Sequence, residues 1–379
     1  MYFQDLNRII NDPHYESNLG RQRINLSQKA YSVLLSDMEA FYVAKPDKAD
    51  CEHISSKFIN QIFQRFWEQA ESTISLAVAN FQYQQVNILQ GMESSARKQA
   101  IDLLTKDYKE QLQNRKLERL QRKGKSYLFR INKTSLELLA NSLIDEKEIY
   151  NDQVGKYFKA LLEEYAEHSY AERESFFFSE ELEKIQLAIN QEKLLQITMR
   201  NDRKDRNDCN DRKEPIYMKP VCIQMDKEMN YHYLAGLQAT SPNAAKRLWS
   251  IICIRISRIQ DCKKMMRSGK VEDGDKNNIM ELIERYGIEY LSGTSNIRQC
   301  YVKLSHEGLH LYKTIQRRRP LYKNMKQEGD YTILEFECTE FQISTYFFQF
   351  GNNAQILKPE SLAKKFKDEF QKAYQQYQK

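Results

Sequence analysis

A chain of 379 residues with 41% hydrophobic and 11% aromatic residues is long enough for two or three domains with cores of their own. It is nevertheless polar, with 29% charged residues and a mean hydropathy of -0.73. No run approaches the ~20 apolar residues of a membrane-spanning helix, and the first residues lack the basic start and apolar core of a signal peptide. Seven cysteines without a Cys-x-x-Cys pair argue against a disulfide framework or a zinc site and favour a reducing cytoplasm.

The net charge of +6 is unevenly distributed along the chain. Residues 97–130 contain eleven Lys and Arg against four Asp and Glu, and residues 313–326 contain six basic residues and no acidic one. The first segment is expected to be a long polar helix. Its charge indicates either a solvated face or a phosphate-binding surface, because phosphate binding requires concentrated positive charge. The second segment contains a proline and is expected to be a loop.

The N-terminal half contains a repeated pattern of one short strand followed by two helices. The strand spans residues 23–27 in the first copy and residues 130–134 in the second, and helical periodicity follows each strand. Ser27 and Thr134 occupy the expected N-cap positions. The pattern therefore predicts two similar strand-helix-helix units.

A strand followed by two helices resembles one half of a ribbon-helix-helix protein. Because half of that fold cannot bury its faces alone, two copies in one chain imply an intramolecular pair with antiparallel strands. Period-2 alternation directs Ile24, Leu26 and Ile131 inward. The outer face then carries Arg23, Asn25, Arg130 and Asn132. In the family this face enters the DNA major groove, whereas the competing interpretation is a ribbon kept only for packing or dimerisation.

After residue 178 the pattern changes to that of a small β-rich domain. Ser179 is expected to cap a helix with an acidic first turn, and residues 194–197 form the first strand. Residues 200–208 are mixed in charge and contain no apolar residue, which is typical of a hairpin loop.

The next segment contains a strand at 231–237, a turn at 240–243 and a second apolar strand from residue 248 that ends in Arg255-Ile256-Ser257-Arg258-Ile259. Charge inside an apolar strand requires an acidic partner or a groove that receives an anion. His232-Tyr233-Leu234 and the arginine motif resemble the bacterial WYL domain, whose strands read Trp-Tyr-Leu and Phe-Arg-Leu-Asp-Arg-Ile. The resemblance implies a five-stranded Sm-like barrel that binds nucleic acid or a nucleotide-like ligand through the tyrosine and the arginines.

Single-stranded nucleic acid is bound by cations that contact phosphates and by aromatic faces that stack on bases. This segment supplies both. The residues expected to bind RNA are Tyr233, Arg255, Arg258, His232, Lys246 and Arg247.

A further part begins near residue 271, with a linker expected at Asp273-Gly274-Asp275. Strands are then expected at 299–304, 331–338 and 354–357, and helices after Ser305, at 341–350 and from Pro359. The final helix is expected to present one apolar side that reaches Tyr374 and Tyr377. This order resembles the extension that follows WYL domains, which supports dimerisation in relatives.

No catalytic or metal-binding motif accompanies these elements. His306 and His310 are four residues apart, but neither a glutamate between them in the usual arrangement nor a downstream ligand completes a metal site. The twelve glycines do not cluster into a phosphate loop. We therefore expect a binding protein rather than an enzyme, with no catalytic residue, metal or cofactor.

The sequence predicts an α+β protein in three parts. These are a helical region with two ribbon-helix-helix-like halves at 1–178, a small Sm-like WYL barrel at 179–270 and an α/β-plait-like extension at 271–379. The combination resembles the WYL accessory proteins of type VI-D RNA-targeting CRISPR systems. It implies a non-enzymatic homodimer that binds single-stranded RNA and stimulates an RNA-guided effector ribonuclease. The alternative is a ribbon-helix-helix regulator of double-stranded DNA whose WYL domain senses a ligand.

Overall fold

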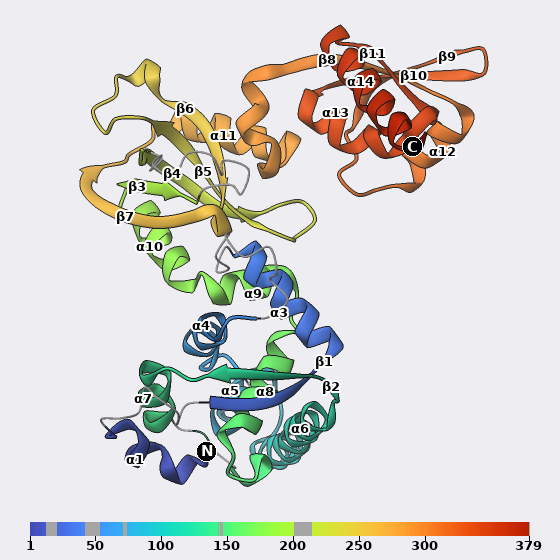
Figure 1. Cartoon of the computed structure of the whole chain (residues 1–379). Helices are drawn as coiled ribbons and strands as arrows, with labels where there is room; N and C mark the ends of the chain where they lie inside the picture. The colour runs from blue at the N-terminus through green and yellow to red at the C-terminus, as the bar shows by residue number, and fades with distance from the viewer. Residues whose placement is uncertain are drawn as a thin grey trace. The chain divides into compact units, whose positions relative to one another are not determined.

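The computed structural model describes residues 1–12, 21–41, 54–70, 74–142, 144, 147–200 and 214–378. It divides into two compact units, Met1–Ser179 and Glu180–Lys379. Within the described residues, one two-stranded sheet lies in the first unit, and a five-stranded and a four-stranded sheet lie in the second, all antiparallel (Figure 1). This confirms the α+β class. None of the described helices combines the length and apolar character needed to cross a membrane.

The first unit is built around an antiparallel ribbon of two strands. Strand β1 (Arg21–Ser27) pairs along its whole length with β2 (Gly124–Arg130), with Arg21 opposite Arg130. Two helices follow each strand: α3 (Gln28–Ala40) and α4 (Ser56–Phe66) after β1, and α7 (Lys133–Asn141) and α8 (Val154–Tyr165) after β2. The predicted intramolecular pairing of two strand-helix-helix units is therefore confirmed.

The first copy matches its prediction at residue level, and the second is displaced. The Ser27 hydroxyl accepts a hydrogen bond from the Ala30 amide at 3.1 Å and caps α3 as expected. In the second copy the strand ends at Arg130, where it was expected to begin. Thr134 is not the cap of α7, because the Asn132 side chain accepts the bond from the Ser135 amide at 2.8 Å.

The displacement has a physical reason in the alternation of β2. Tyr127 and Phe129 point inward and are buried, so the strand that fills the core is the aromatic one that precedes residue 130. Ile24, Leu26 and Ile131 are also buried, as predicted. The buried side chains of the ribbon therefore belong to β1 and β2, except for Ile131, which follows directly after β2.

The rest of the first unit is helical. It consists of α1 (Leu6–Ile10), α5 (Ile74–Ile88), α6 (Ser94–Gln121), α9 (Tyr170–Phe177) and the 3-10 turns η1 (Phe3–Asp5) and η2 (Lys147–Tyr150). Helices α5 and α6 form a hairpin in which the Phe81 and Tyr108 rings stack with centroids 4.3 Å apart. The predicted polar helix within residues 97–130 is α6, and it ends at Gln121 before β2 begins.

The core of the first unit contains aromatic rings and one buried ion pair. The Phe41 and Phe177 rings stack with centroids 4.8 Å apart. Arg173 Nε donates to Asp37 Oδ2 at 2.6 Å, and the Tyr165 hydroxyl donates to the same oxygen at 3.1 Å. Because Asp37 is fully buried, this network satisfies a charge that would otherwise be costly.

The second unit begins with α10 (Ser179–Asn190). Ser179 was expected to cap this helix, but it is the first residue of the helix itself. The five-stranded sheet follows, in the order β6-β5-β4-β3-β7. Its strands are β3 (Lys193–Met199), β4 (Ile216–Met225), β5 (His232–Ala239), β6 (Ser250–Arg255) and β7 (Ile259–Ser268). Within the described residues no ladder joins β6 to β7, so the strands of the expected barrel form an open sheet. The expected loop at 200–208 lies outside the described residues from position 201 onward.

One helix and one 3-10 segment pack on this sheet. They are α11 (Asp273–Tyr286) and η5 (Ile288–Asn296), whose Ile279, Ile283 and Leu291 share a core with Ala235 of β5. The linker predicted at residues 273–275 is wrong, because these residues form the first turn of α11. Carboxylates are stabilised in the first turn of a helix, since the N-terminal end of a helix carries partial positive charge.

The last part of the chain alternates strands and helices in the order of a split βαβ motif. Its elements are β8 (Ile297–Leu304), α12 (His306–Thr314), β9 (Tyr322–Glu328), β10 (Tyr331–Thr339), α13 (Glu340–Phe347), η6 (Phe348–Asn353), β11 (Ala354–Lys358) and α14 (Glu360–Gln376). The sheet order is β11-β8-β10-β9 (Figure 1). Val302 and Phe336 of the two central strands are buried in its core.

Three details of this part differ from the prediction. Strand β9 was not expected, because all its residues are exposed and it lacks an apolar alternation. The expected helix at 341–350 ends at Phe347 and continues as η6. Helix α14 buries Leu362 and Phe366, but Tyr374 and Tyr377 are 63% and 91% exposed, so its apolar side ends earlier than predicted.

Candidate nucleic-acid interface

The candidate site is formed at one end of the five-stranded sheet, where a turn joins β4 to β5. Asp226 fixes this turn: its Oδ1 accepts hydrogen bonds from the amides of Asn230 at 2.6 Å and Tyr231 at 3.2 Å. The Asp226 amide donates to the Tyr231 carbonyl oxygen at 3.0 Å. A buried aspartate in this role is typical of turns, because its carboxylate replaces backbone acceptors. The turn thereby sets the position of Tyr231 immediately before β5.

The cluster of Tyr231, Tyr233 and Arg255 contains the main chemistry of this site. In the β5–β6 ladder Arg255 is the direct partner of Tyr233. The Arg255 guanidinium carbon lies 3.6 Å from the centroid of the Tyr231 ring, which is a close cation–π geometry. The turn therefore places Tyr231 under the arginine that pairs with Tyr233 across the ladder.

The electrostatics of this cluster are mixed rather than uniformly basic. Burial raises the pKa of Tyr233 to about 12; Arg255 acts in the opposite direction, and the nearby carboxylates of Asp226 and Glu289 add to the rise. Burial also raises the pKa of Glu289, with a further contribution from Asp226. An arginine, two phenols and two carboxylates therefore share one region. Such a region favours stacking and hydrogen bonding over simple phosphate attraction.

Two other residues predicted to bind RNA, His232 and Arg258, differ from this pair in strand face or in element. His232 is the ladder partner of Met225, and as the neighbour of Tyr233 in the strand it belongs to the opposite face. Arg258 lies in η4 (Ile256–Arg258), not in a strand as expected, and its carbonyl oxygen accepts a bond from the Arg200 amide at 2.9 Å. The structure therefore brings Tyr233 and Arg255 together across the ladder, and RNA binding by the six residues stays a prediction.

Lys246 and Arg247 lie at the opposite end of the same strands, in η3 (Lys246–Leu248). Five ladder steps separate the pair Tyr233–Arg255 from the pair Gln238–Ser250 next to this turn, which corresponds to roughly 17 Å at the rise of a strand. Lys246 also forms an ion pair with Glu272. These two cations therefore lie too far away to share one nucleotide with Arg255.

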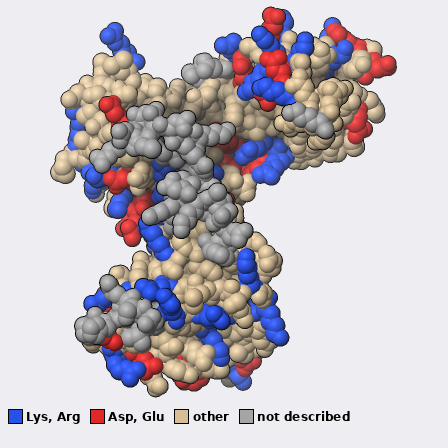
Figure 2. All heavy atoms as spheres, viewed as in Figure 1, with Lys and Arg blue, Asp and Glu red and all other residues tan. Residues whose placement is uncertain are grey.

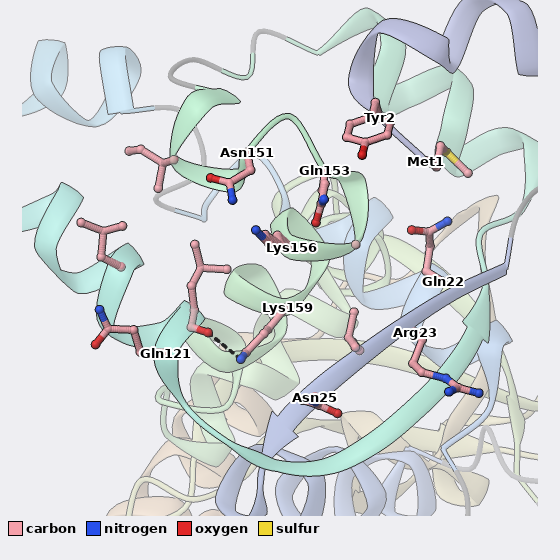
Figure 3. Close-up of a pocket in the computed structure, with 15 residues that line it drawn as sticks. Met1, Tyr2, Gln22, Arg23, Asn25, Gln121, Asn151, Gln153, Lys156 and Lys159 are labelled. Atoms are coloured by element: carbon pink, nitrogen blue, oxygen red, sulfur yellow. Dashed lines mark hydrogen bonds between the residues drawn. The ribbon is translucent and has the colours of Figure 1, made fainter.

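The outer face of the ribbon keeps two of its four predicted residues. Arg23 and Asn25 are exposed on β1 and line a pocket that is also lined by residues of α6 and α8 (Figure 3). Arg130 is exposed at the far end of β2, opposite Arg21. Asn132 follows the strand and caps α7 instead of projecting from the ribbon. The four residues do not form one continuous reading surface.

The basic segment 97–130 is partly neutralised inside the first unit. Arg119, which is only 3% exposed, binds Glu164 at 3.0 Å and Glu167 at 2.7 Å. Arg122 binds Glu163 at 3.2 Å and Glu167 at 2.7 Å. These two arginines join α6 to the end of α8 and the residues that follow it. On the face of this unit seen in Figure 2, Lys and Arg occur at many places, and Asp and Glu lie mainly along the lower edge.

A second aromatic surface, which the sequence prediction did not include, lies on the four-stranded sheet. Lys303 Nζ lies 3.9 Å from the ring centroid of Tyr331, and Lys358 Nζ lies 5.7 Å from that of Tyr301. Tyr301 and Tyr331 belong to the two central strands, β8 and β10, on positions that alternate with the buried ones. The alternation that predicts these strands also directs both tyrosines outward, and this is the signal that identifies them.

His306 and His310 both lie on α12. In the described parts of the chain, no group of three or more His, Cys, Asp or Glu side chains is arranged to hold a metal ion.

The whole chain has a counterpart among solved structures. It superposes on the crystal structure of a CRISPR Cas-related protein with a TM-score of 0.68 and 21% identity, over 97% of this chain and 96% of that one. The two chains therefore share a fold from end to end. A proteasome accessory factor B/C (PafBC) of Arthrobacter aurescens aligns with 12% identity over 64% of this chain and 35% of its own, but a TM-score of 0.25 does not define a common fold. No family model and no curated protein matches the sequence.

Proposed function

We propose that this protein is a non-enzymatic accessory component of an RNA-targeting CRISPR system, which binds single-stranded RNA and raises the activity of an RNA-guided effector ribonuclease. The class of system is supported by the likeness over nearly full length to a CRISPR Cas-related protein. The resemblance of the β5–β6 segment to a WYL domain supports the ligand class. A homodimer is part of the proposal, and light scattering after size-exclusion chromatography measures it.

The single observation that carries RNA binding is the Arg255 guanidinium over the Tyr231 ring, with Tyr233 as the cross-strand partner of Arg255. Aromatic and guanidinium planes stack on unpaired bases, which are available in single strands and hidden in duplexes. The outward Tyr301 and Tyr331 of the four-stranded sheet offer further aromatic faces. Together these residues favour a single-stranded partner.

The test is a titration of the purified full chain against matched single-stranded RNA, single-stranded DNA and duplex DNA at two salt concentrations. We expect the tightest binding to RNA, with a shallow salt dependence, because the cluster contains a single arginine beside the carboxylates of Asp226 and Glu289. Stimulation of the cognate effector ribonuclease is then measured with and without the protein. Failure to prefer single strands, or no stimulation, would contradict the proposal.

The alternative is a regulator that binds duplex DNA through the ribbon, and the paired strands with outward Arg23 and Asn25 favour it. It predicts preference for a palindromic duplex and a loss of that preference in Arg23→Ala. The capping role of Asn132 argues against it, since one of four expected contacts serves the fold instead. The same titration separates the two functions.

A further inference from the structure

Helix α5 lies in a stretch of sequence without charge. Residues 72–92 include no Asp, Glu, Lys, Arg or His, although 29% of the chain is charged. α5 occupies most of this stretch, and its main neighbour is α6, with which it forms a hairpin (Figure 1). Depletion of charge is typical of the centre of a protein interface rather than of a solvated helix. The composition of α5 is therefore that of an interface helix.

The hairpin leaves much of α5 accessible. None of residues 77–111, which include the turn between the two helices, is buried. Even Phe81, whose ring stacks on Tyr108 of α6, is only half-buried. Helices in proteins gain their stability mainly from packing of an apolar face. One neighbouring helix is therefore not enough to cover α5.

A stripe of exposed side chains lies on α5 beside the side that packs on α6. Ala79, Tyr83 and Val86 form it, and Gln90 continues the spacing in the turn that ends the helix. The spacing is four, three and four residues, which places these positions on one side of a helix. Tyr83 is 72% exposed and Val86 is 43% exposed. The stripe thus has the spacing of a coiled-coil seam.

This stripe is complementary to a second copy of itself. Its spacing reads the same in both directions, so an antiparallel copy places Tyr83 against Val86, and Ala79 against Gln90. Such a contact has a two-fold axis, which requires a self-complementary surface. A helix without charge meets this requirement, because no like charges approach each other across the axis. The Asn and Gln side chains of α5 also meet it, since an amide group both donates and accepts hydrogen bonds.

We propose that α5 pairs with α5 of a second copy of this chain, antiparallel about a two-fold axis between Tyr83 and Val86. The proposal rests on the homodimer that belongs to the proposed function, and it names a surface for that dimer. Because α5 is about 22 Å long, the contact is shorter than a standard interface and the association should be weak. The C-terminal extension, which supports dimerisation in relatives, is a different part of the chain.

Sedimentation equilibrium of the full chain over a range of concentrations measures this association. Y83E and V86K each place a charge against an apolar side chain, so each should weaken association about tenfold or more. An equimolar mixture of Y83E and V86K should restore association, because the two new charges are opposite and meet across the axis. Q84E is the matched control and should associate normally, since Gln84 is an exposed residue of the same helix outside the stripe.

The outcomes separate this contact from the rest of the proposed function. A wild-type chain that stays monomeric would overturn the homodimer and this contact together. A wild-type dimer that Y83E and V86K leave unchanged would overturn the α5 contact alone and assign dimerisation to another surface. Losses in both variants that the mixture does not restore, or an equal loss in Q84E, would overturn the antiparallel pairing. RNA binding is titrated separately, so its absence does not bear on this contact. Thermal unfolding confirms that each variant is folded.

Discussion

The contact between α6 and α8 in the first unit and the cluster at Tyr231 in the second both contain arginines, but the arginines meet different partners. Arg119 is buried between the carboxylates of Glu164 and Glu167. Arg255 lies over the face of Tyr231 at 3.6 Å. A carboxylate neutralises a guanidinium and occupies its donors, whereas an aromatic ring contacts the face of a guanidinium and leaves its charge in place. The kind of partner, not the number of basic residues, separates arginines that stabilise the fold from those suited to binding.

The largest effect expected from this comparison is on stability. Replacing Arg119 by methionine leaves Glu164 buried without its main partner, which should lower the free energy of unfolding by about 3–5 kcal/mol. K106M on the exposed side of the same helix is the control, and it should change that free energy by less than about 0.5 kcal/mol. Denaturant unfolding measures both. RNA affinity, measured below the unfolding transition, should be the same in both variants; a weaker affinity in R119M alone would break the comparison.

The next effect is on binding. Arg255→Ala removes the guanidinium that covers Tyr231 and should weaken RNA binding about tenfold, the size expected when one stacked contact is lost. Thermal stability should change little, because Arg255 is half-buried at the end of β6. R247A provides the matched control in η3 at the other end of the strands. Equal losses of RNA affinity in R255A and R247A would mean that RNA binding depends on charge distributed over the surface rather than on this cluster.

Local rules predicted much of this fold. Ser27 and Ser305 cap helices because a serine hydroxyl accepts a hydrogen bond from a free amide of the first turn. Serine just before a helical pattern therefore predicts the cap from the sequence alone. The pairing of β1 with β2 followed from repetition, since a strand-helix-helix unit needs a second copy to bury its face. The pair Tyr233 and Arg255 was predicted from a resemblance, and the ladder places the two residues opposite each other.

What the sequence did not predict depends on contacts between distant segments. The separation of Lys246 from Arg255 follows from strand direction, because a hairpin places the turn and the open end far apart. The carboxylates that neutralise Arg119 lie 45 and 48 residues later in the chain, so a count over residues 97–130 misses them. Strand β9 has no buried residue and therefore no alternation to detect.

A smaller effect concerns acid stability at the α6–α8 contact. Burial alone would raise the pKa of Glu167. The hydrogen bonds and charges of Arg119 and Arg122 outweigh burial and lower this pKa below its ordinary value of 4.5. The stabilisation is therefore present above pH 4.5 and is lost as the pH falls through the lowered pKa. Thermal unfolding between pH 3 and 6 measures it. R122Q should reduce the dependence by less than about 1 kcal/mol, and a dependence that stays the same would show that Arg122 does not act on Glu167.

The smallest effect expected is on the titration of a single phenol. It tests whether Tyr233, the cross-strand partner of Arg255, is buried. Burial raises the pKa of Tyr233 to about 12 while Arg255 lowers it, so Tyr233 should ionise after an exposed tyrosine with its pKa of 10. In an ultraviolet titration, Y233F should therefore remove one of the 23 tyrosine signals from the range above pH 11. R255Q should move that signal to still higher pH, because the cation that favours the phenolate is gone. If Y233F instead removed a phenol that ionises near pH 10, Tyr233 would be solvated, and its place as the cross-strand partner of a stacked arginine would not hold.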